Sequence, residues 1–241
     1  MRFGTWNVSS LYRSGSLTAA VRELARFKLD LLGAQQARWD KGGTVGQREH
    51  GGTKGARWDK GGTVGAGDYK FFYGKGNENH NLGTIFLYIR RVSAVKKVEF
   101  VSDRVSYIVL RGRWCNIIVL NMHAPSQEKS DDSKDNFNDE LEQFFCHFPK
   151  YCMKILLGDC NGKVGRENIF KSKLGIRVYI RIVMIMVLAN FATSKNLADK
   201  STMFPNRNTY KYIWTSPDEK TYNQIDHILK NRRWDSNILY V

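Results

Sequence analysis

Short apolar runs rich in β-branched residues recur along this chain, separated by turn or charged segments. This pattern is typical of buried and half-buried strands. The expected strands are 2–8, 29–35, 69–73, 84–89, 106–111, 116–123 and 154–159, followed by a late hairpin of 212–215 and 224–229 joined by SPDEKTYN.

Two segments have the spacing of helices instead. One is expected to begin at the capping residue Ser16, since Val21 and Leu24 behind it lie at helical spacing. The other covers 131–148. Strands interspersed with helices indicate an α/β protein in which sheets pack face to face and helices lie outside.

The chain carries a large excess of positive charge. Lys and Arg number 38 against 23 Asp and Glu in 241 residues, a formal net charge of +15 at pH 7. Such a field favours polyanions such as nucleic acid or an anionic membrane surface, although surplus lysine also serves solubility alone. Hydrophobic residues make up 42% of the chain, which argues against a disordered or fibrous protein.

The cysteines and the apolar runs indicate in which cellular compartment the protein is expected. The four cysteines show no CxxC spacing, which argues against a zinc ribbon or a disulfide framework and favours a reducing environment. The N-terminus lacks the form of a secretory signal, and the most apolar run, 182–189, is far shorter than the roughly 20 residues that span a bilayer. We expect a soluble monomer of the nucleus or cytoplasm, without a membrane partner.

The decapeptide ARWDKGGTVG occurs twice, at 37–46 and at 56–65. A single repeat does not make a solenoid, which needs several stacked units. We interpret 37–65 as a duplicated surface loop, since lengthening a loop costs only about 0.6 kcal/mol per doubling. A basic glycine-rich arm that touches phosphates is the functional alternative.

The segment RVYIRIVMIMVL at 177–188 has neither clean alternation nor a helical period. Codons that encode 181–186 can be written so that a shifted frame encodes Asp-Ser-Asn-Asp-Asn. This suggests a polar loop translated out of frame over 172–188. An ordinary buried strand is the alternative.

Four polar clusters follow four separate apolar strands. They are TWN at 5–7, GAQQARW at 33–39, NMHAP at 121–125 and GDCN at 158–161. Residues two apart in a strand share a face, so Asp159 and Asn161 are expected to point at one ligand, as are Asn121 and His123. Each residue alone fits a turn or cap. Together, on a basic chain, they indicate a hard cation that bridges to phosphate.

These motifs, with LLGDCN followed by KVG, and WTSP leading to QIDHIL, occur in the order found in the endonuclease/exonuclease/phosphatase superfamily. The chain resembles most closely the endonuclease domains of non-LTR retrotransposons. The resemblance covers almost the whole chain. It implies a four-layer α/β/β/α sandwich that hydrolyses DNA phosphodiesters with Mg²⁺ at the mouth between the two sheets.

The resemblance also implies roles for the matching residues. Asn7 would lie in the metal-side cluster. Asp159 would orient or deprotonate the attacking water, with Asn161 beside it to hold the phosphate. Asp226 would orient the general-base histidine.

Two further residues match the pattern more loosely. His123 stands where many relatives have a tyrosine near the phosphate, and it would donate a hydrogen bond there. Trp214 would stack on a nucleic-acid base or fill the core, and core packing is the expected alternative.

Departures from the family pattern bear on activity. Gln36 stands where the family has the glutamate that ligates magnesium, and an uncharged amide is a poorer ligand for a hard cation. The family's last strand, with its Asp-His pair, lies beyond Val241. Losing a general base or a transition-state donor costs roughly 10²- to 10⁴-fold each. We therefore expect a single domain over 1–241, truncated at its C-terminus with the last strand missing, and catalytically impaired.

Three functional hypotheses stay open on the sequence. The chain is a Mg²⁺-dependent DNA endonuclease with residual activity, or a basic nucleic-acid-binding domain without catalysis. The third is a pseudogene-like translation without a stable product, which the duplication and the out-of-frame segment support.

Overall fold

The computed structural model describes residues 1–8, 16–36, 62–66, 68–74, 83–89, 94–126, 129–160, 191–199, 214–215, 222–223 and 226–233. At 16–18, 64, 66, 199, 214–215, 222–223 and 226–227 only the backbone is described. The segment 172–188, the first copy of the decapeptide and Asn161 lie outside the described residues, so the expectations for them stay predictions.

The first sheet has five strands in the order β1-β2-β5-β4-β3. Their bounds are β1 (Phe3–Asn7), β2 (Leu31–Gln35), β3 (Gly62–Ala66), β4 (Tyr69–Tyr73) and β5 (Ile85–Ile89). β1 and β2 are parallel, and helix α1 (Ser16–Phe27) lies between them in the chain. The other neighbouring strands are antiparallel.

The second sheet has six strands in the order β10-β13-β9-β8-β7-β6. Their bounds are β6 (Val95–Phe100), β7 (Val105–Leu110), β8 (Ile117–His123), β9 (Met153–Asp159), β10 (Leu197–Asp199) and β13 (Asp226–Asn231). β8 and β9 are parallel, and helix α2 (Asp131–His147) crosses between them.

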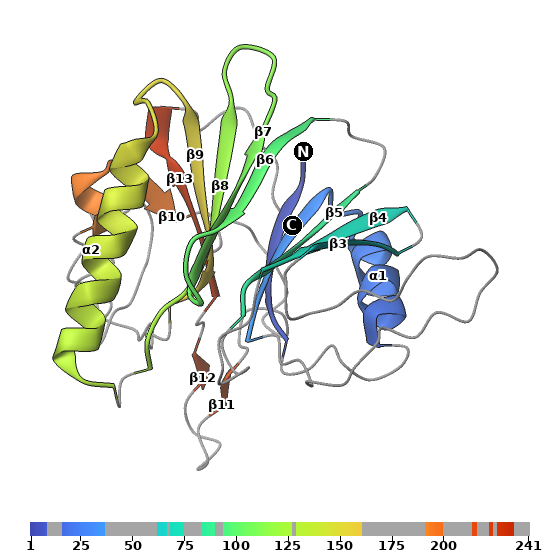
Figure 1. Ribbon diagram of the computed structural model, residues 1–241, viewed down its shortest axis with the longest axis horizontal. Helices are drawn as coiled ribbons and strands as arrows, with labels where there is room; N and C mark the ends of the chain where they lie inside the picture. The colour runs from blue at the N-terminus through green and yellow to red at the C-terminus, as the bar shows by residue number, and fades with distance from the viewer. Residues whose placement is uncertain are drawn as a thin grey trace.

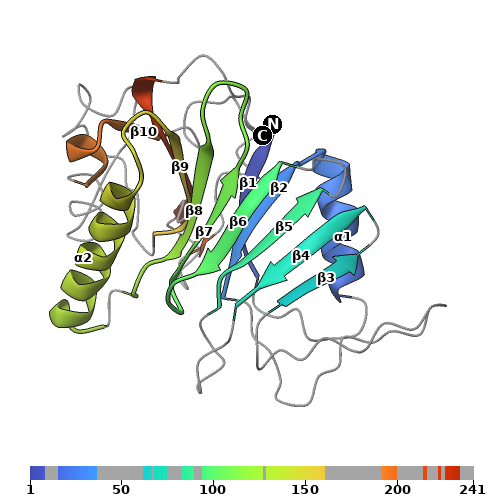
Figure 2. The same ribbon diagram turned by 45° about the horizontal axis from the view of Figure 1, so that its top comes forward.

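Apolar clusters join these elements into four layers. One cluster lies between the sheets and includes Phe3 and Phe86 of the first sheet and Val119 and Leu157 of the second. The helices cover the outer faces, α1 on the five-stranded sheet and α2 on the six-stranded sheet (Figures 1 and 2). The expected α/β/β/α sandwich is confirmed.

Helical spacing explains why α2 covers its sheet. Phe137, Leu141 and Phe145 recur every four residues and are the buried residues of this helix, whereas the remaining positions are mostly polar. The same spacing puts Ala20 and Leu24 of α1 against the other sheet. No helix in the described ranges is long and apolar enough to cross a bilayer.

The strand directions bring the polar clusters to one end of the sandwich. Asn7 ends β1 opposite Gln35 at the end of β2. His123 ends β8 opposite Asp159 at the end of β9. Carboxyl ends of parallel strands meet at the same edge of a sheet, so the clusters gather there.

Two expectations about the strands were wrong. The late hairpin pairs β11 (Trp214–Thr215) with β12 (Tyr222–Asn223), whereas β13 lies between β9 and β10 in the six-stranded sheet. The buried Ile228 and Leu229 of β13 explain its central position. In addition, residues 62–65 of the second decapeptide belong to strand β3, which pairs with β4. This part of 37–65 is therefore a sheet edge and not a loop.

Candidate active site at the ends of the central strands

Asp159 is the centre of the polar cluster at this end of the sandwich. It is fully buried at the end of β9. Its Oδ2 accepts a hydrogen bond from Nδ2 of Asn7 at 2.8 Å and a longer one from Nε2 of Gln36 at 3.4 Å. A buried carboxylate is stable only with such partners, because desolvation of its charge is costly. The two amide N–H groups therefore compensate part of its charge.

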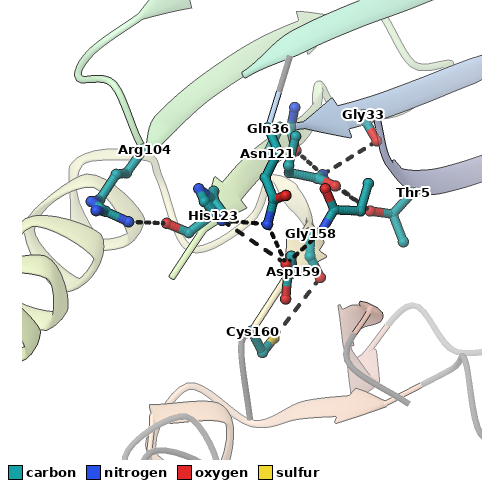
Figure 3. Close-up of polar contacts among 11 residues, drawn as sticks. Thr5, Gly33, Gln36, Arg104, Asn121, His123, Gly158, Asp159 and Cys160 are labelled. Carbon is teal, nitrogen blue, oxygen red and sulfur yellow. Dashed lines mark hydrogen bonds and ion pairs between the residues drawn. The ribbon is translucent and has the colours of Figure 1, made fainter. Parts of the chain in front are cut away.

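His123 lies beside this carboxylate. Its Nε2 is 3.9 Å from Oδ2 of Asp159 and 3.2 Å from Nε2 of Gln36. Burial, and secondarily the positive charge of Arg104, lower the pKa of His123 to about 4. The imidazole is therefore neutral at pH 7, and its contact with Asp159 is not an ion pair. Figure 3 shows the side chains of Gln36, His123 and Asp159 directed toward one another.

Arg104 lies behind His123. Its Nη1 donates to the carbonyl oxygen of His123 at 3.3 Å, and the backbone nitrogen of His123 donates to the carbonyl oxygen of Arg104 at 2.9 Å. Burial lowers the pKa of this guanidinium, which nevertheless stays charged at neutral pH. A cation is therefore held next to the cluster, on a loop that no motif singled out.

The approach of β9 to β8 requires a glycine directly before Asp159. Gly158 has a φ of 144°, and a Cβ there would lie 1.9 Å from the carbonyl oxygen of Met122. Only glycine adopts this conformation without strain at so short a distance. One residue further on, the backbone nitrogen of Ala124 donates to the carbonyl oxygen of Asp159 at 2.9 Å. The main chains that carry Asp159 and His123 are thus in direct contact.

A second polar layer lies beneath this cluster, between the sheets. Asn121 of β8 is fully buried, and its Nδ2 donates to the carbonyl oxygens of Ala34 at 3.1 Å and Ile85 at 2.9 Å. Its Oδ1 accepts a short hydrogen bond from Nε2 of Gln35. The expectation that Asn121 shares a ligand with His123 was wrong, because its side chain is used to join the two sheets.

Thr5 and Gly33 complete this layer. The hydroxyl of Thr5 accepts a hydrogen bond from Nε2 of Gln35 at 3.1 Å. A Cβ at Gly33 would lie 3.0 Å from the side chain of Asn121, so the glycine leaves space for the amide. The sequence signal for this layer was two polar residues, Gln35 and Asn121, within otherwise apolar strands. The sequence alone does not show that these strands face each other across Gly33.

The structure brings together four of the predicted site residues. Asn7, Gln36, His123 and Asp159 come from the ends of β1, β2, β8 and β9. Gln36, just after β2, has a left-handed backbone with a φ of 56°, which is uncommon for a residue other than glycine.

The other predicted residues are less fully described. The Cα atom of Asp226 is the register partner of the Cα atom of Asp159 on the neighbouring strand. Trp214 lies in the short strand β11, and its side chain, like that of Asp226, is outside the described part of the structure. Asn161 is also outside it.

The described residues do not form a ligand set suited to Mg²⁺. Among them, no group of three or more His, Cys, Asp or Glu side chains is placed to hold a metal ion. Mg²⁺ binds carboxylates, waters and phosphate oxygens in octahedral geometry. Around Asp159, however, Asn7 and Gln36 direct N–H groups at the carboxylate. Because both contacts supply N–H groups to Oδ2 of Asp159, the described arrangement fits an amide-compensated carboxylate better than a magnesium centre.

No protein-family model matches the chain. A similar curated protein is craniofacial development protein 2 of Bos taurus, 25% identical over 238 residues, which cover 98% of this chain and 36% of the relative. The chain therefore spans little more than a third of the length of the curated relatives it matches.

Solved structures with a similar architecture include three nucleases. The 3′-5′ exonuclease NExo from Neisseria meningitidis has a TM-score of 0.65 and 17% identity, covering 100% of this chain and 90% of that one. The AP endonuclease LMAP from Leishmania major has a TM-score of 0.68 and 14% identity, covering 98% and 80%. The endonuclease domain of TRAS1, a telomere-specific non-LTR retrotransposon, has a TM-score of 0.60 and 9% identity, covering 95% and 84%. At these identities the likeness shows the fold.

Proposed function

From the endonuclease/exonuclease/phosphatase fold of this chain, we propose that it is a DNA-binding domain of nuclease ancestry with impaired phosphodiester hydrolysis. A structure of NExo holds a product DNA hairpin, which supports DNA as the class of ligand. One observation carries the impairment: at the candidate site, Gln36 meets the Asp159 carboxylate with an amide N–H where a second carboxylate would recruit a cation.

The chain's own side chains retain part of the chemistry of hydrolysis. Asp159 would accept a hydrogen bond from the attacking water and orient it, although the amide donors on Oδ2 stabilise the carboxylate form and make it a weaker base. Neutral His123 would donate a ring N–H to a phosphate oxygen. Arg104 beside it would supply positive charge near the phosphate.

Plasmid nicking tests this proposal. We expect the full chain to nick supercoiled plasmid slowly at most, and Asp159→Asn to abolish this residual reaction. Gln36→Glu should raise the rate about tenfold or more, because a charged ligand would restore cation binding next to the reacting phosphate. Gln143→Glu is the matched control, since Gln143 is exposed on α2, and it should leave the rate unchanged.

Two outcomes would contradict the proposal. Nicking that survives Asp159→Asn does not come from this site. Rapid nicking by the unmodified chain, lost in Asp159→Asn and not increased by Gln36→Glu, would show that the site is intact.

A second candidate function is nucleic-acid binding without any cleavage. The net charge of +15 and the lack of a described metal-ligand group favour it. It predicts that the chain retains DNA at low salt, that retention falls steeply as salt rises, and that no variant nicks. Absence of DNA binding at low salt would exclude it. Detection of the intact polypeptide in cells would exclude the third hypothesis, a translation without a stable product.

A further inference from the structure

A strongly exposed tryptophan lies at the end of the sandwich opposite the candidate active site. Trp114 is 84% exposed in the turn between β7 and β8. This turn is at the top of the six-stranded sheet in Figure 1, from which β8 and β9 run down to the ends that carry His123 and Asp159. β8 has 7 residues, so about 20 Å separates the two ends.

The turn that carries Trp114 is tightly constrained. A Cβ at Gly112 would lie 2.2 Å from the carbonyl oxygen of Cys115, so the turn closes only with glycine at this position. Its base is held by the backbone nitrogen of Arg111, which donates to the carbonyl oxygen of Ala94 at 2.6 Å. Trp114 therefore projects from a tight turn whose base is hydrogen-bonded to the start of the neighbouring strand β6.

Positive charge surrounds this tryptophan. The guanidinium of Arg113 lies 5.3 Å from the centre of the Trp114 ring. Arg111 is exposed at the start of the turn, and Nζ of Lys96 donates to Oδ1 of Asn116 at its end, at 2.8 Å. The segment 111–116 contains no acidic residue.

The loop before β9 reaches the same end. The backbone nitrogen of Met153 donates to the carbonyl oxygen of Asn116 at 3.1 Å. Two residues earlier lies Tyr151, which is 63% exposed, next to the exposed Lys150. Two exposed aromatic rings and four cations, Lys96, Arg111, Arg113 and Lys150, thus project from neighbouring segments.

We propose that this end of the molecule binds single-stranded nucleic acid. Aromatic rings stack on unpaired bases without much sequence preference, and flanking cations hold the phosphates. In a duplex the bases are already stacked on each other, so they offer no free face on which the Trp114 ring could stack. A membrane surface fits less well, because the immediate neighbours of Trp114 in the turn, Arg113 and Cys115, supply little apolar area for insertion.

Fluorescence anisotropy with a labelled oligothymidylate of 12 nucleotides tests the proposal on the full chain in EDTA. Trp114→Ala should weaken binding about tenfold, within the range that one stacked base contributes, and Trp114→Phe should recover most of it. Arg111→Gln with Arg113→Gln should lower the slope of log K against log salt by about 0.7 for each phosphate that these arginines no longer neutralise.

A matched control comes from a second cation–aromatic pair, far from Trp114 in the sequence. Arg26 lies over the ring of Phe27 at 4.9 Å on α1, so Arg26→Gln and Phe27→Leu should leave binding unchanged.

The proposal is overturned if Trp114→Ala binds the oligonucleotide as tightly as the unmodified chain. It is also overturned if a blunt duplex of the same length depends on Trp114 as strongly as the single strand does. Vesicles with 30% phosphatidylserine form the last arm: if Trp114→Ala abolishes vesicle binding and retains oligonucleotide binding, the surface is assigned to lipid.

Discussion

The amide nitrogen of Asn7 donates a 2.8 Å hydrogen bond to the Asp159 carboxylate, from a strand of one sheet to a strand of the other. The two residues are 152 positions apart in the chain. The candidate site is therefore built across the seam between the sheets, and the contacts of Asn7 and Gln36 also bear on how the sheets are joined.

Removing this bond should destabilise the fold. Asn7→Ala leaves the buried carboxylate with one fewer donor, and we expect a loss of about 1–3 kcal/mol in the free energy of unfolding. Urea denaturation measures it, and a double-mutant cycle with Asp159→Ala should give a coupling of at least about 1 kcal/mol. Asn116→Ala, which removes an exposed bond to Lys96, is the control and should cost under about 0.5 kcal/mol. A coupling near zero would show that the bond contributes nothing.

Gln36→Glu should make stability depend on divalent cations. In EDTA a second carboxylate would face Asp159, where an amide nitrogen now lies at 3.4 Å, and we expect a loss of about 2 kcal/mol or more. Magnesium should then raise the melting temperature of this variant much more than that of the unmodified chain, because a ligand that binds only the folded state stabilises it. Gln36→Met lacks the charge and should show no magnesium response. An equal response in all three proteins would refute this explanation.

Acid should destabilise the metal-free protein through His123. The folded-state pKa of about 4 lies below the ordinary value of about 6.5, so between these pH values the unfolded chain binds more protons. The contribution of neutral His123 to the free energy of unfolding is fully present above pH 6.5. It is lost as pH falls toward 4, by on the order of 3 kcal/mol over the whole window. Urea denaturation in EDTA at pH 7.0 and pH 4.5 measures the loss. In His123→Gln this loss of stability between pH 7.0 and pH 4.5 should be clearly smaller. If the variant loses as much stability as the unmodified chain, other groups cause the loss.

The layer beneath the site should matter more for stability than for chemistry. Asn121→Leu deprives the carbonyl oxygens of Ala34 and Ile85 of their cross-sheet donor, and we expect a loss of roughly 2–4 kcal/mol. Ser106 is the matched control: it is buried opposite Asn121 on β7, and its hydroxyl has no hydrogen-bond partner among the described residues. Ser106→Ala should change stability by less than about 1 kcal/mol. Equal losses in the two variants would contradict this assignment.

Local patterns in the sequence predicted most of the elements because strands and helices differ in the period of their apolar residues. The strand 69–73 has the expected bounds, and the first helix begins at Ser16 as expected. Strand β6 was missed because its sequence, VKKVEF, places lysines on an edge where alternation is weak. The partner of β13 was assigned wrongly because pairing between distant strands depends on the whole sheet and not on neighbouring residues.

The same limit applies to the site. Polar clusters at strand ends contain Asn7, Gln36, His123 and Asp159, and the family resemblance singled out Asn7 and Gln36 among the residues of their clusters. Arg104 lies on a loop without a motif, so only the fold reveals that it touches His123.

One side chain, Asn121, is bonded to two strands of the opposite sheet directly under the candidate site. The distance between the sheets is therefore set there before any ligand arrives. Binding of a ligand at this end of the sandwich should therefore not need the two sheets to move apart. Preorganisation of this kind also means that little ordering entropy is lost on binding.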